Sequence, residues 1–224
     1  MSQSQDQQKR ASALVALEWV KPTEILGVGT GSTVNALIAL MQEKKHFPKA
    51  AVSSSKATTA LLSQLGVEVL ELNSVGPISC YIDGADECDP GFRLIKGGGG
   101  ALTREKIIAQ AAKEFICLID DSKRVEVLGR FPLPVEVIQM ARSQIARLLV
   151  GLGGTPSWRQ KDGQGYLTDN GHWIIDVADL VITNPDALEA TLNAEPGVVC
   201  VGLFARRAAD IVICSGKRLQ QSKS

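Results

Sequence analysis

Short apolar runs alternate with helically spaced apolar residues over the first half of the chain. Between Ala13 and Val20 the apolar residues recur at the spacing of one helix face, and Pro22 ends this predicted helix. The same pattern predicts further helices at 34–41, 56–65 and 103–113, and strands at 25–28, 50–53, 67–72, 78–82 and 115–120. Strands that alternate with helices are typical of a parallel sheet covered by helices.

The pattern changes at Phe131, where two prolines within four residues exclude a helix interior or a central strand. We expect a small α+β unit beyond this point, with strands at 135–137 and 198–204, helices at 141–152 and 188–193, and a hairpin turn at 169–171. The Asn-Gly pair in that turn favours type I′. A strand at 210–214 is expected to return to the first sheet, ahead of a polar tail. The predicted domains are residues 1–130 with 205–224, and residues 131–204.

Composition narrows the class of protein. Lys and Arg together number 24, as do Asp and Glu, and a net charge of zero argues against nucleic acid or an anionic membrane as the main partner. No apolar run approaches the ~18 residues of a membrane helix. The first ten residues lack the apolar segment of a secretory signal, so we expect a cytosolic protein.

Cysteine and histidine usage bears on metals and disulfides. The five cysteines lack paired spacing, so we expect reduced thiols, most of them in strands. The two histidines, His46 and His172, cannot build a multi-histidine metal site.

The first candidate site is Gly27–Thr33 (GVGTGST), between a predicted strand and a predicted helix. Backbone N–H groups converge on an anion at such a helix start, which favours a phosphate. A dinucleotide loop is excluded because the third glycine comes one position early and Ser53–Ser55 replaces the acidic ribose ligand. A Walker loop lacks its Gly-Lys-Ser/Thr. A tight turn capped by Ser32 or Thr33 stays open as the alternative.

Two further motifs carry charged residues. Asp83–Glu87 (DGADE) follows a predicted strand, so two carboxylates emerge where open α/β sheets bind ligands; a turn with solvated acids is the alternative. In the second motif Lys96 precedes the four glycines Gly97–Gly100, and Glu105 falls in the first turn of the next helix. Four successive glycines are entropically costly, which favours an anion-binding nest over a flexible linker.

Together the three motifs suit proton transfer on a phosphorylated sugar. Removal of a proton next to a carbonyl creates an enediolate, which needs a carboxylate base and cationic or N–H stabilisation of the oxygen. That chemistry requires no redox cofactor and no metal. Eight of the 21 glycines lie in these motifs, at positions 27, 29, 31, 84, 97, 98, 99 and 100.

The motifs resemble those of the type A ribose-5-phosphate isomerase family, in order from about Lys9 to Asp210. The resemblance rests on GVGTGST, SSS, DGADE, KGGGGALTREKI, FPLPVEV and the PGVV-VGLFA-R-AD stretch of residues 196–210. It implies interconversion of ribose 5-phosphate and ribulose 5-phosphate in the non-oxidative pentose phosphate pathway, without cofactor or metal, by a homodimer or homotetramer. It also implies a Rossmann-like, mostly parallel sheet with helices on both faces, plus a smaller ferredoxin-like α+β domain.

The resemblance also assigns roles to residues. Glu105 matches the general base, Asp83 the carboxylate that opens the sugar ring, and Asp86 and Lys96 the groups that hold hydroxyls and stabilise the enediolate. The implied substrate contacts are Lys9, Thr30, Gly31, Ser32, Thr33, Asp83, Gly84, Ala85, Asp86, Lys96, Gly97, Gly98, Gly99 and Lys123. Lys56 departs from the acid of some relatives, and the tail after Ile213 departs from the usual ending.

Two rival functions stay open at this point. A sugar-phosphate sensor would share an α/β effector domain, but no helix-turn-helix precedes the first strand and a sensor would not need Glu105. An isomerase for another phosphosugar, such as arabinose 5-phosphate, fits the same residues.

Overall fold

The computed structural model describes residues 4–221, which form two compact units. The first unit comprises the chain up to Ala85, Arg104–Arg124 and the chain from Ala209. The second comprises Asp86–Thr103 and Val125–Ala208. The chain therefore passes between the units four times.

These units differ from the expected domains mainly in the segment 86–103, which falls within the expected first domain, residues 1–130 with 205–224, but belongs to the second unit. Strands β4 (Glu87–Cys88) and β5 (Leu94–Ile95) within it form a three-stranded antiparallel sheet with β13 (Leu203–Phe204). This pairing places the segment in the second unit. The sequence did not predict it, because strands of two residues are too short to show a hydrophobic period. The outer boundaries lie near 125 and 208, against the expected 131 and 204.

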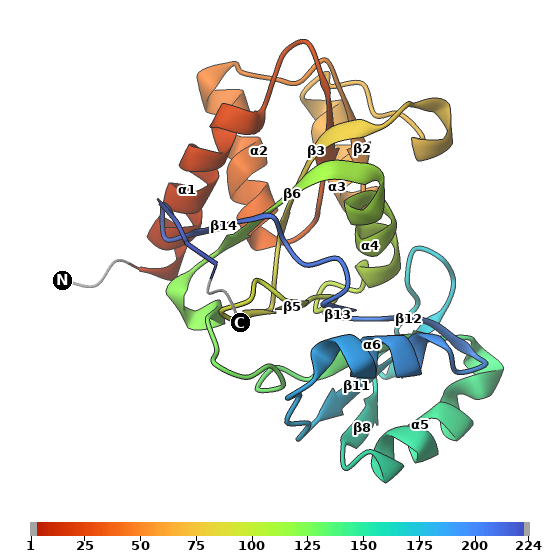
Figure 1. Ribbon diagram of the computed structural model, residues 1–224. Helices are drawn as coiled ribbons and strands as arrows, with labels where there is room; N and C mark the ends of the chain where they lie inside the picture. Colours follow the sequence, from red (N-terminus) through yellow and green to blue (C-terminus); the bar gives the residue numbers. More distant parts are fainter. Residues whose placement is uncertain (1–3, 222–224) are drawn as a thin grey trace. The chain divides into compact units, whose positions relative to one another are not determined.

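A six-stranded sheet forms the centre of the first unit (Figure 1). Its order is β15-β14-β6-β3-β1-β2, and every neighbouring pair is parallel except the β14–β15 hairpin. The strands are β1 (Ile25–Val28), β2 (Ala50–Ser53), β3 (Ile78–Gly84), β6 (Ala112–Ile119), β14 (Ile211–Cys214) and β15 (Lys217–Arg218).

Helices cover both faces of this sheet. Leu26, Cys80 and Ile116 belong to a core shared with the apolar residues of α1 and α2. Their neighbours point to the opposite face, where a Cβ on Gly27 would meet Tyr81 and Ile108 of α4 at 2.9 and 3.0 Å. The helical segments are α1 (Gln5–Ala16), η1 (Leu17–Trp19), α2 (Ser32–Lys44), α3 (Lys56–Gln64), η2 (Leu72–Ser74), α4 (Leu102–Ala111) and η3 (Asp121–Lys123).

The second unit contains a four-stranded antiparallel sheet of order β12-β7-β11-β8. Leu149 and Leu192 pack with Val135 and Ile175, so α5 and α6 cover one face. The βαββαβ sequence with this strand order is the ferredoxin-like pattern. The elements are β7 (Leu133–Val137), η4 (Gln139–Ala141), α5 (Arg142–Gly151), β8 (Thr155–Trp158), β9 (Gln160–Lys161), β10 (Gln164–Gly165), β11 (Trp173–Ala178), α6 (Pro185–Asn193) and β12 (Val198–Val201).

The predicted fold class is confirmed, and four local predictions are wrong. Pro134, which was expected to exclude a central strand, lies inside β7 between β12 and β11; it is tolerated near the start of the strand because β12 pairs only with Val135–Val137. The strand expected at 67–72 is reduced to a single bridge between Ala51 and Val69. The strand expected at 198–204 divides at Gly202, because β12 pairs with β7 while β13 pairs with β5. The hairpin turn is not type I′: Gly171 has φ +81°, but Asn170 is not left-handed.

The C-terminal tail and the cysteines were also the subject of sequence predictions. Part of the tail from Lys217 forms β15, and residues 222–224 lie outside the described part. All five cysteines lie within the described residues; they are buried, form no disulfide, and each lies in a strand, as expected. Within residues 4–221 no helix is both long and apolar enough to cross a bilayer.

Cys80 makes the stability of the first unit depend on pH. Burial, followed by the charges of Glu114, Glu24 and Asp210, raises the pKa of this thiol from 9.0 to about 12. The folded state therefore retains a proton that the unfolded chain loses above pH 9. Stability from this group is complete below pH 9 and declines up to about pH 12, by at most ~1.4 kcal/mol per pH unit.

We predict that Cys80→Ala makes the loss of stability at alkaline pH shallower than in the wild type. Urea unfolding at several pH values on both sides of pH 9 measures the slope directly. The variant is expected to be less stable at neutral pH because a buried side chain is shortened. Equal slopes for both proteins would contradict the assignment to Cys80.

Candidate active site

The carboxyl ends of three neighbouring parallel strands bring several predicted residues to one edge of the six-stranded sheet. Val28 of β1 is in register with Ile82 of β3, and Gly84 of β3 with Leu118 of β6. The GVGTGST loop, Asp83 and Lys123 follow or end these strands. This is the edge at which open α/β sheets bind ligands.

The helix start after β1 has the features of an anion site. Gly31, with φ +105°, is the N-cap of α2, and no side chain caps the helix. The alternative of a turn capped by Ser32 or Thr33 is therefore wrong. Gly31 and Ser32 are exposed, so the first-turn amides face an accessible surface. An uncapped helix N-terminus favours a bound anion.

Asp83 is fully buried at the end of β3. Its Oδ1 accepts the backbone N–H groups of Thr30 (3.1 Å) and Gly84 (2.7 Å), and its Oδ2 accepts the hydroxyl of Tyr81. Gly29 is required beside it, because a Cβ there would lie 2.0 Å from Oδ1. The carboxylate thus fixes the GVGTGST loop to the DGADE strand, which contradicts the alternative of a solvated acid.

Tyr81 lies beside Asp83 in the first unit. Its hydroxyl is completely buried, with the Phe115 ring 5.2 Å away between centroids. Burial, and then the negative charges of Asp83 and Glu105, raises the pKa of Tyr81 well above its ordinary value. The hydroxyl therefore stays protonated and donates at neutral pH. Glu105 itself is 3% exposed, in the first turn of α4, as expected.

Two cations that were predicted to contact the substrate, Lys123 and Lys9, belong to segments near the end of β6. Lys123 ends the η3 turn, which begins with Asp120 accepting the Ser122 N–H at 3.0 Å. Helix α1 contacts the same turn through Gln8, whose Oε1 accepts the Asp121 N–H at 3.1 Å. Lys9 follows Gln8 in α1 and is half-buried. The helix of Lys9 therefore lies beside the turn of Lys123.

The other predicted residues belong to the second unit, which begins at Asp86 directly after the half-buried Ala85. Asp86 accepts the Gly98 N–H on Oδ2 at 2.8 Å, and its own N–H donates to Ile95 at 2.8 Å. A Cβ on Gly98 would lie 2.7 Å from Asp86 Oδ1. Asp86 is therefore held against the glycine run.

Lys96 is 3% exposed at the end of β5. Its N–H donates to Gly202 at 2.9 Å, and its Nζ lies 5.5 Å from the centre of the Phe204 ring. An ammonium group over an aromatic face is stabilised by the ring quadrupole. A buried, oriented cation beside a glycine run is suited to stabilising an oxyanion.

We call Gly97–Gly100 the glycine loop. Gly97 and Gly100 have φ of +105° and +82°, and the Gly100 N–H donates to Gly97 at 2.9 Å. A Cβ on Gly97 would lie 2.9 Å from Leu102, and one on Gly100 would lie 2.4 Å from the Tyr166 hydroxyl. The loop is therefore an ordered turn with specific contacts, and the flexible-linker alternative is wrong.

Sequence reasoning missed three polar residues around these motifs. Tyr81 precedes Asp83 by two residues in a strand, so the period of two was a signal that both share a face. Glu136 is buried and accepts the hydroxyls of Thr103 and Thr168, the latter at 2.8 Å. Arg159 bonds to the glycine loop and lies far from it in sequence, where no motif marks it.

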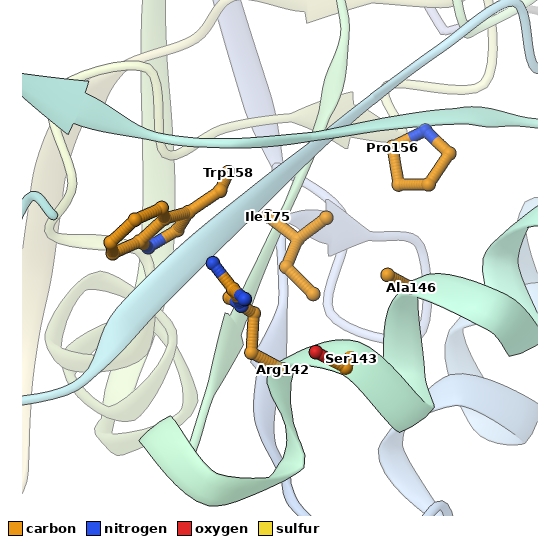
Figure 2. A pocket seen from close by; sticks show the side chains of 6 residues that line it. All are labelled: Arg142, Ser143, Ala146, Pro156, Trp158 and Ile175. Carbon is orange, nitrogen blue, oxygen red and sulfur yellow. The ribbon is translucent and has the colours of Figure 1, made fainter.

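One hollow of the second unit contains none of the predicted residues. It measures about 220 Å³ and is lined by Arg142, Ser143, Ala146, Pro156, Trp158 and Ile175 (Figure 2). The Arg142 guanidinium stacks over the Trp158 ring at 4.6 Å. Across the described residues, no group of three His, Cys, Asp or Glu side chains is arranged to hold a metal ion.

We predict that Gly29→Ala lowers the free energy of unfolding by about 1–3 kcal/mol, because the added methyl overlaps buried Asp83. Gly76→Ala is the matched control, since its Cβ would meet nothing within 4 Å and its φ is not left-handed. Urea unfolding of both variants measures the difference. Similar stabilities for the two variants would show that Asp83 is not held as described.

Comparison with known proteins identifies the family. The family model for ribose 5-phosphate isomerase A (phosphoriboisomerase A) matches residues 50–218. Ribose-5-phosphate isomerase A of Stenotrophomonas maltophilia is 58% identical over 210 residues, 93% of this chain and 96% of the relative. The crystal structure of ribose 5 phosphate isomerase A from Neisseria gonorrhoeae has a TM-score of 0.93 at 42% identity, covering 98% of this chain and 99% of its own. A structure of D-ribose-5-phosphate isomerase in complex with phospho-erythronic acid has a TM-score of 0.93 at 35% identity, covering 97% and 100%. The chain belongs to the ribose 5-phosphate isomerase A family.

Proposed function

We propose that this protein interconverts D-ribose 5-phosphate and D-ribulose 5-phosphate through an enediolate, by carboxylate-mediated proton transfer. Membership of the family supports the reaction. The observation that carries the mechanism is the burial of two carboxylates in the first unit, Asp83, which accepts the Tyr81 hydroxyl, and Glu105 in the first turn of α4. Because Tyr81 keeps its proton, it stabilises the ionised form of Asp83, the carboxylate assigned to ring opening.

The reaction begins with opening of the sugar ring. Asp83 takes the proton of the hydroxyl at C1 and delivers it to the ring oxygen as the bond between C1 and the ring oxygen breaks, which gives the open-chain aldehyde. Glu105 then removes the proton from C2, and the electron pair moves to form the C1–C2 double bond and an oxyanion on O1. The same carboxyl returns the proton to C1 while the O2 proton passes to O1, which completes the ketose. Each proton removed is thus returned, so no oxidant or reductant is consumed.

Stabilisation of the oxyanion falls to the second unit in this proposal. Lys96 supplies a positive charge, and the glycine loop supplies backbone N–H groups. Asp86 holds a substrate hydroxyl while keeping its bond to Gly98. Preorganised donors of this kind stabilise developing charge without reorganisation, which makes them effective in a site closed to water.

The phosphate end of the substrate is assigned to the start of α2. The uncapped N-terminus and the hydroxyls of Thr30, Ser32 and Thr33 support a dianionic ligand there. Lys123 adds positive charge at the same sheet edge, and Lys9 adds it from the helix that contacts the turn of Lys123. The solved relative in complex with phospho-erythronic acid supports a phosphorylated short-chain ligand, whose carboxylate resembles the charge of an enediolate.

The wider context is part of the same proposal. The reaction places the enzyme in the non-oxidative pentose phosphate pathway, and no cofactor or metal enters the scheme. Five buried cysteines without a disulfide support a reducing compartment, so we propose a cytosolic location. We propose a homodimer or homotetramer on the resemblance alone.

Incubation of the purified protein with ribose 5-phosphate, with ketose formation followed over time, tests the function. Turnover that a chelator leaves unchanged is the expected result. Binding of ribose 5-phosphate without turnover would favour the sugar-phosphate sensor. Faster turnover of arabinose 5-phosphate would favour the other isomerase.

We predict that Glu105→Gln lowers kcat by at least ~100-fold with little change in KM, because the amide cannot accept the C2 proton. Glu68→Gln, at an exposed position, is the control and is expected to retain full activity. Exchange of the C2 proton with deuterated solvent, followed by NMR, measures the proton transfer itself. Near wild-type exchange in Glu105→Gln would assign the base elsewhere.

We also predict that the double variant Ser32→Ala, Thr33→Ala binds ribose 5-phosphate roughly 10- to 100-fold more weakly, because hydrogen bonds to a charged phosphate are lost. Unphosphorylated ribose, which does not use this loop, is expected to bind as it does to the wild type. Calorimetric titration with both sugars makes the comparison. An equal loss for both would remove the phosphate from this loop.

A further inference from the structure

The glycine loop is held from its carbonyl side by two side chains that no motif contains. Arg159 Nη1 donates to the carbonyls of Gly97 at 2.9 Å and Gly98 at 3.2 Å. The Tyr166 hydroxyl donates to the carbonyl of Gly99 at 3.2 Å. Three successive carbonyls therefore face side-chain donors of the same unit.

The sheet of the second unit explains why Arg159 reaches this loop. Trp158 and Ile175 line the hollow beside α5 (Figure 2). Arg159 and Asp176 are the next residues on the same two strands, and the Arg159 N–H donates to Ile174 at 2.9 Å, which continues the ladder. Because side chains alternate along a strand, both residues point to the face that α5 and α6 leave uncovered.

Asp176 orients the arginine. Its Oδ2 accepts Arg159 Nε at 2.8 Å, and its Oδ1 accepts Arg159 Nη2, so the pair is bidentate. Nη1 is left to hold the two carbonyls. All three nitrogens of the guanidinium are thus engaged in a planar fork, a geometry that a lysine ammonium cannot reproduce.

Fixing the carbonyls determines where the amides point. No peptide bond in residues 4–221 is cis, and in a trans peptide the C=O and N–H groups point in opposite directions. The Gly98 carbonyl faces Arg159, so the Gly99 N–H of the same peptide faces away from it. Gly99 is exposed, and no acceptor within the described residues pairs with its N–H. A guanidinium on the carbonyl polarises the peptide and strengthens this N–H as a donor.

We propose that Arg159, oriented by Asp176, is a positioning residue of the isomerase, which aims the Gly99 N–H at the oxyanion of the enediolate and polarises it. The inference rests on the proposed isomerisation and deepens it, since it names the donor and the residue that sets its direction. Tyr166 supports the same arrangement from the next carbonyl. The contribution is made in the transition state, where negative charge develops on the substrate oxygen.

The test compares Arg159→Lys and Arg159→Met with the matched variant Arg142→Met. Arg142 lies on the opposite face of the same sheet, where it stacks over Trp158 and Trp173, and it does not touch the glycine loop. We expect the Arg159 variants to lower kcat roughly 10- to 100-fold with KM for ribose 5-phosphate within about threefold. Arg142→Met is expected to retain wild-type kcat, even if its melting temperature falls.

Two further measurements separate positioning from general stability. Affinity for phospho-erythronic acid, whose carboxylate carries the charge of the enediolate, is expected to fall in proportion to kcat/KM across the Arg159 variants. Millimolar guanidinium is expected to restore part of the kcat of Arg159→Met and none in Arg142→Met. Unchanged kcat in both Arg159 variants, or a loss equal to that of Arg142→Met, would overturn the proposal.

The outcomes also distinguish this inference from the function on which it rests. Absence of isomerase activity in the wild-type protein would overturn the proposed function, whereas an active wild type with fully active Arg159 variants would overturn only the role of Arg159. If Arg159→Met does not fold, Arg159→Lys and Tyr166→Phe decide. Tyr166→Phe removes one neutral hydrogen bond and is expected to lower kcat roughly threefold to tenfold; full activity in both would overturn the proposal.

Discussion

A carboxylate removed from water needs hydrogen-bond donors around it, and for two buried acids of this protein backbone amides of loops are among the donors. Asp83 binds the amides of Thr30 and Gly84. Glu87, which is also fully buried, binds the amides of Gly129 and Phe131 at 2.8 and 2.6 Å. A displaced loop would leave a buried charge unsatisfied, so the burial of acids fixes the loops on which the chemistry depends.

The regular elements were predictable where apolar residues form a continuous run or follow the helical spacing, and where the whole run pairs within one sheet. Strands 25–28 and 50–53 were predicted at their observed bounds because both are short, apolar and flanked by helices. The segment 67–72 alternates apolar residues with two glutamates and lies beside the edge strand β2, where a single bridge is all that forms. The run 198–204 was predicted as one strand, but it forms two strands of different sheets on either side of Gly202. A change of sheet within one apolar run does not alter the hydrophobic pattern.

The residues of the candidate site also fall into those that the sequence could indicate and those that it could not. Residues inside motifs could be proposed from the sequence because three motifs of glycines, hydroxyls and charged residues follow one another at predicted strand ends. Residues that hold the motifs could not. Arg159 lies 62 positions from Gly97, and its role depends on which face of a strand it occupies and on its pairing with Asp176. Such contacts are set by tertiary structure, so local patterns carry no record of them.

The position of β14 in the six-stranded sheet has a consequence for synthesis of the protein. This strand pairs with β6, although 91 residues separate Ile119 from Ile211 in the chain, and it also carries the β15 hairpin. Until the ribosome has released residues 211–214, the edge of β6 has no strand partner on that side. Nascent and truncated chains would therefore expose a long apolar strand edge that the finished protein covers, and they are the forms in which edge-to-edge aggregation is expected.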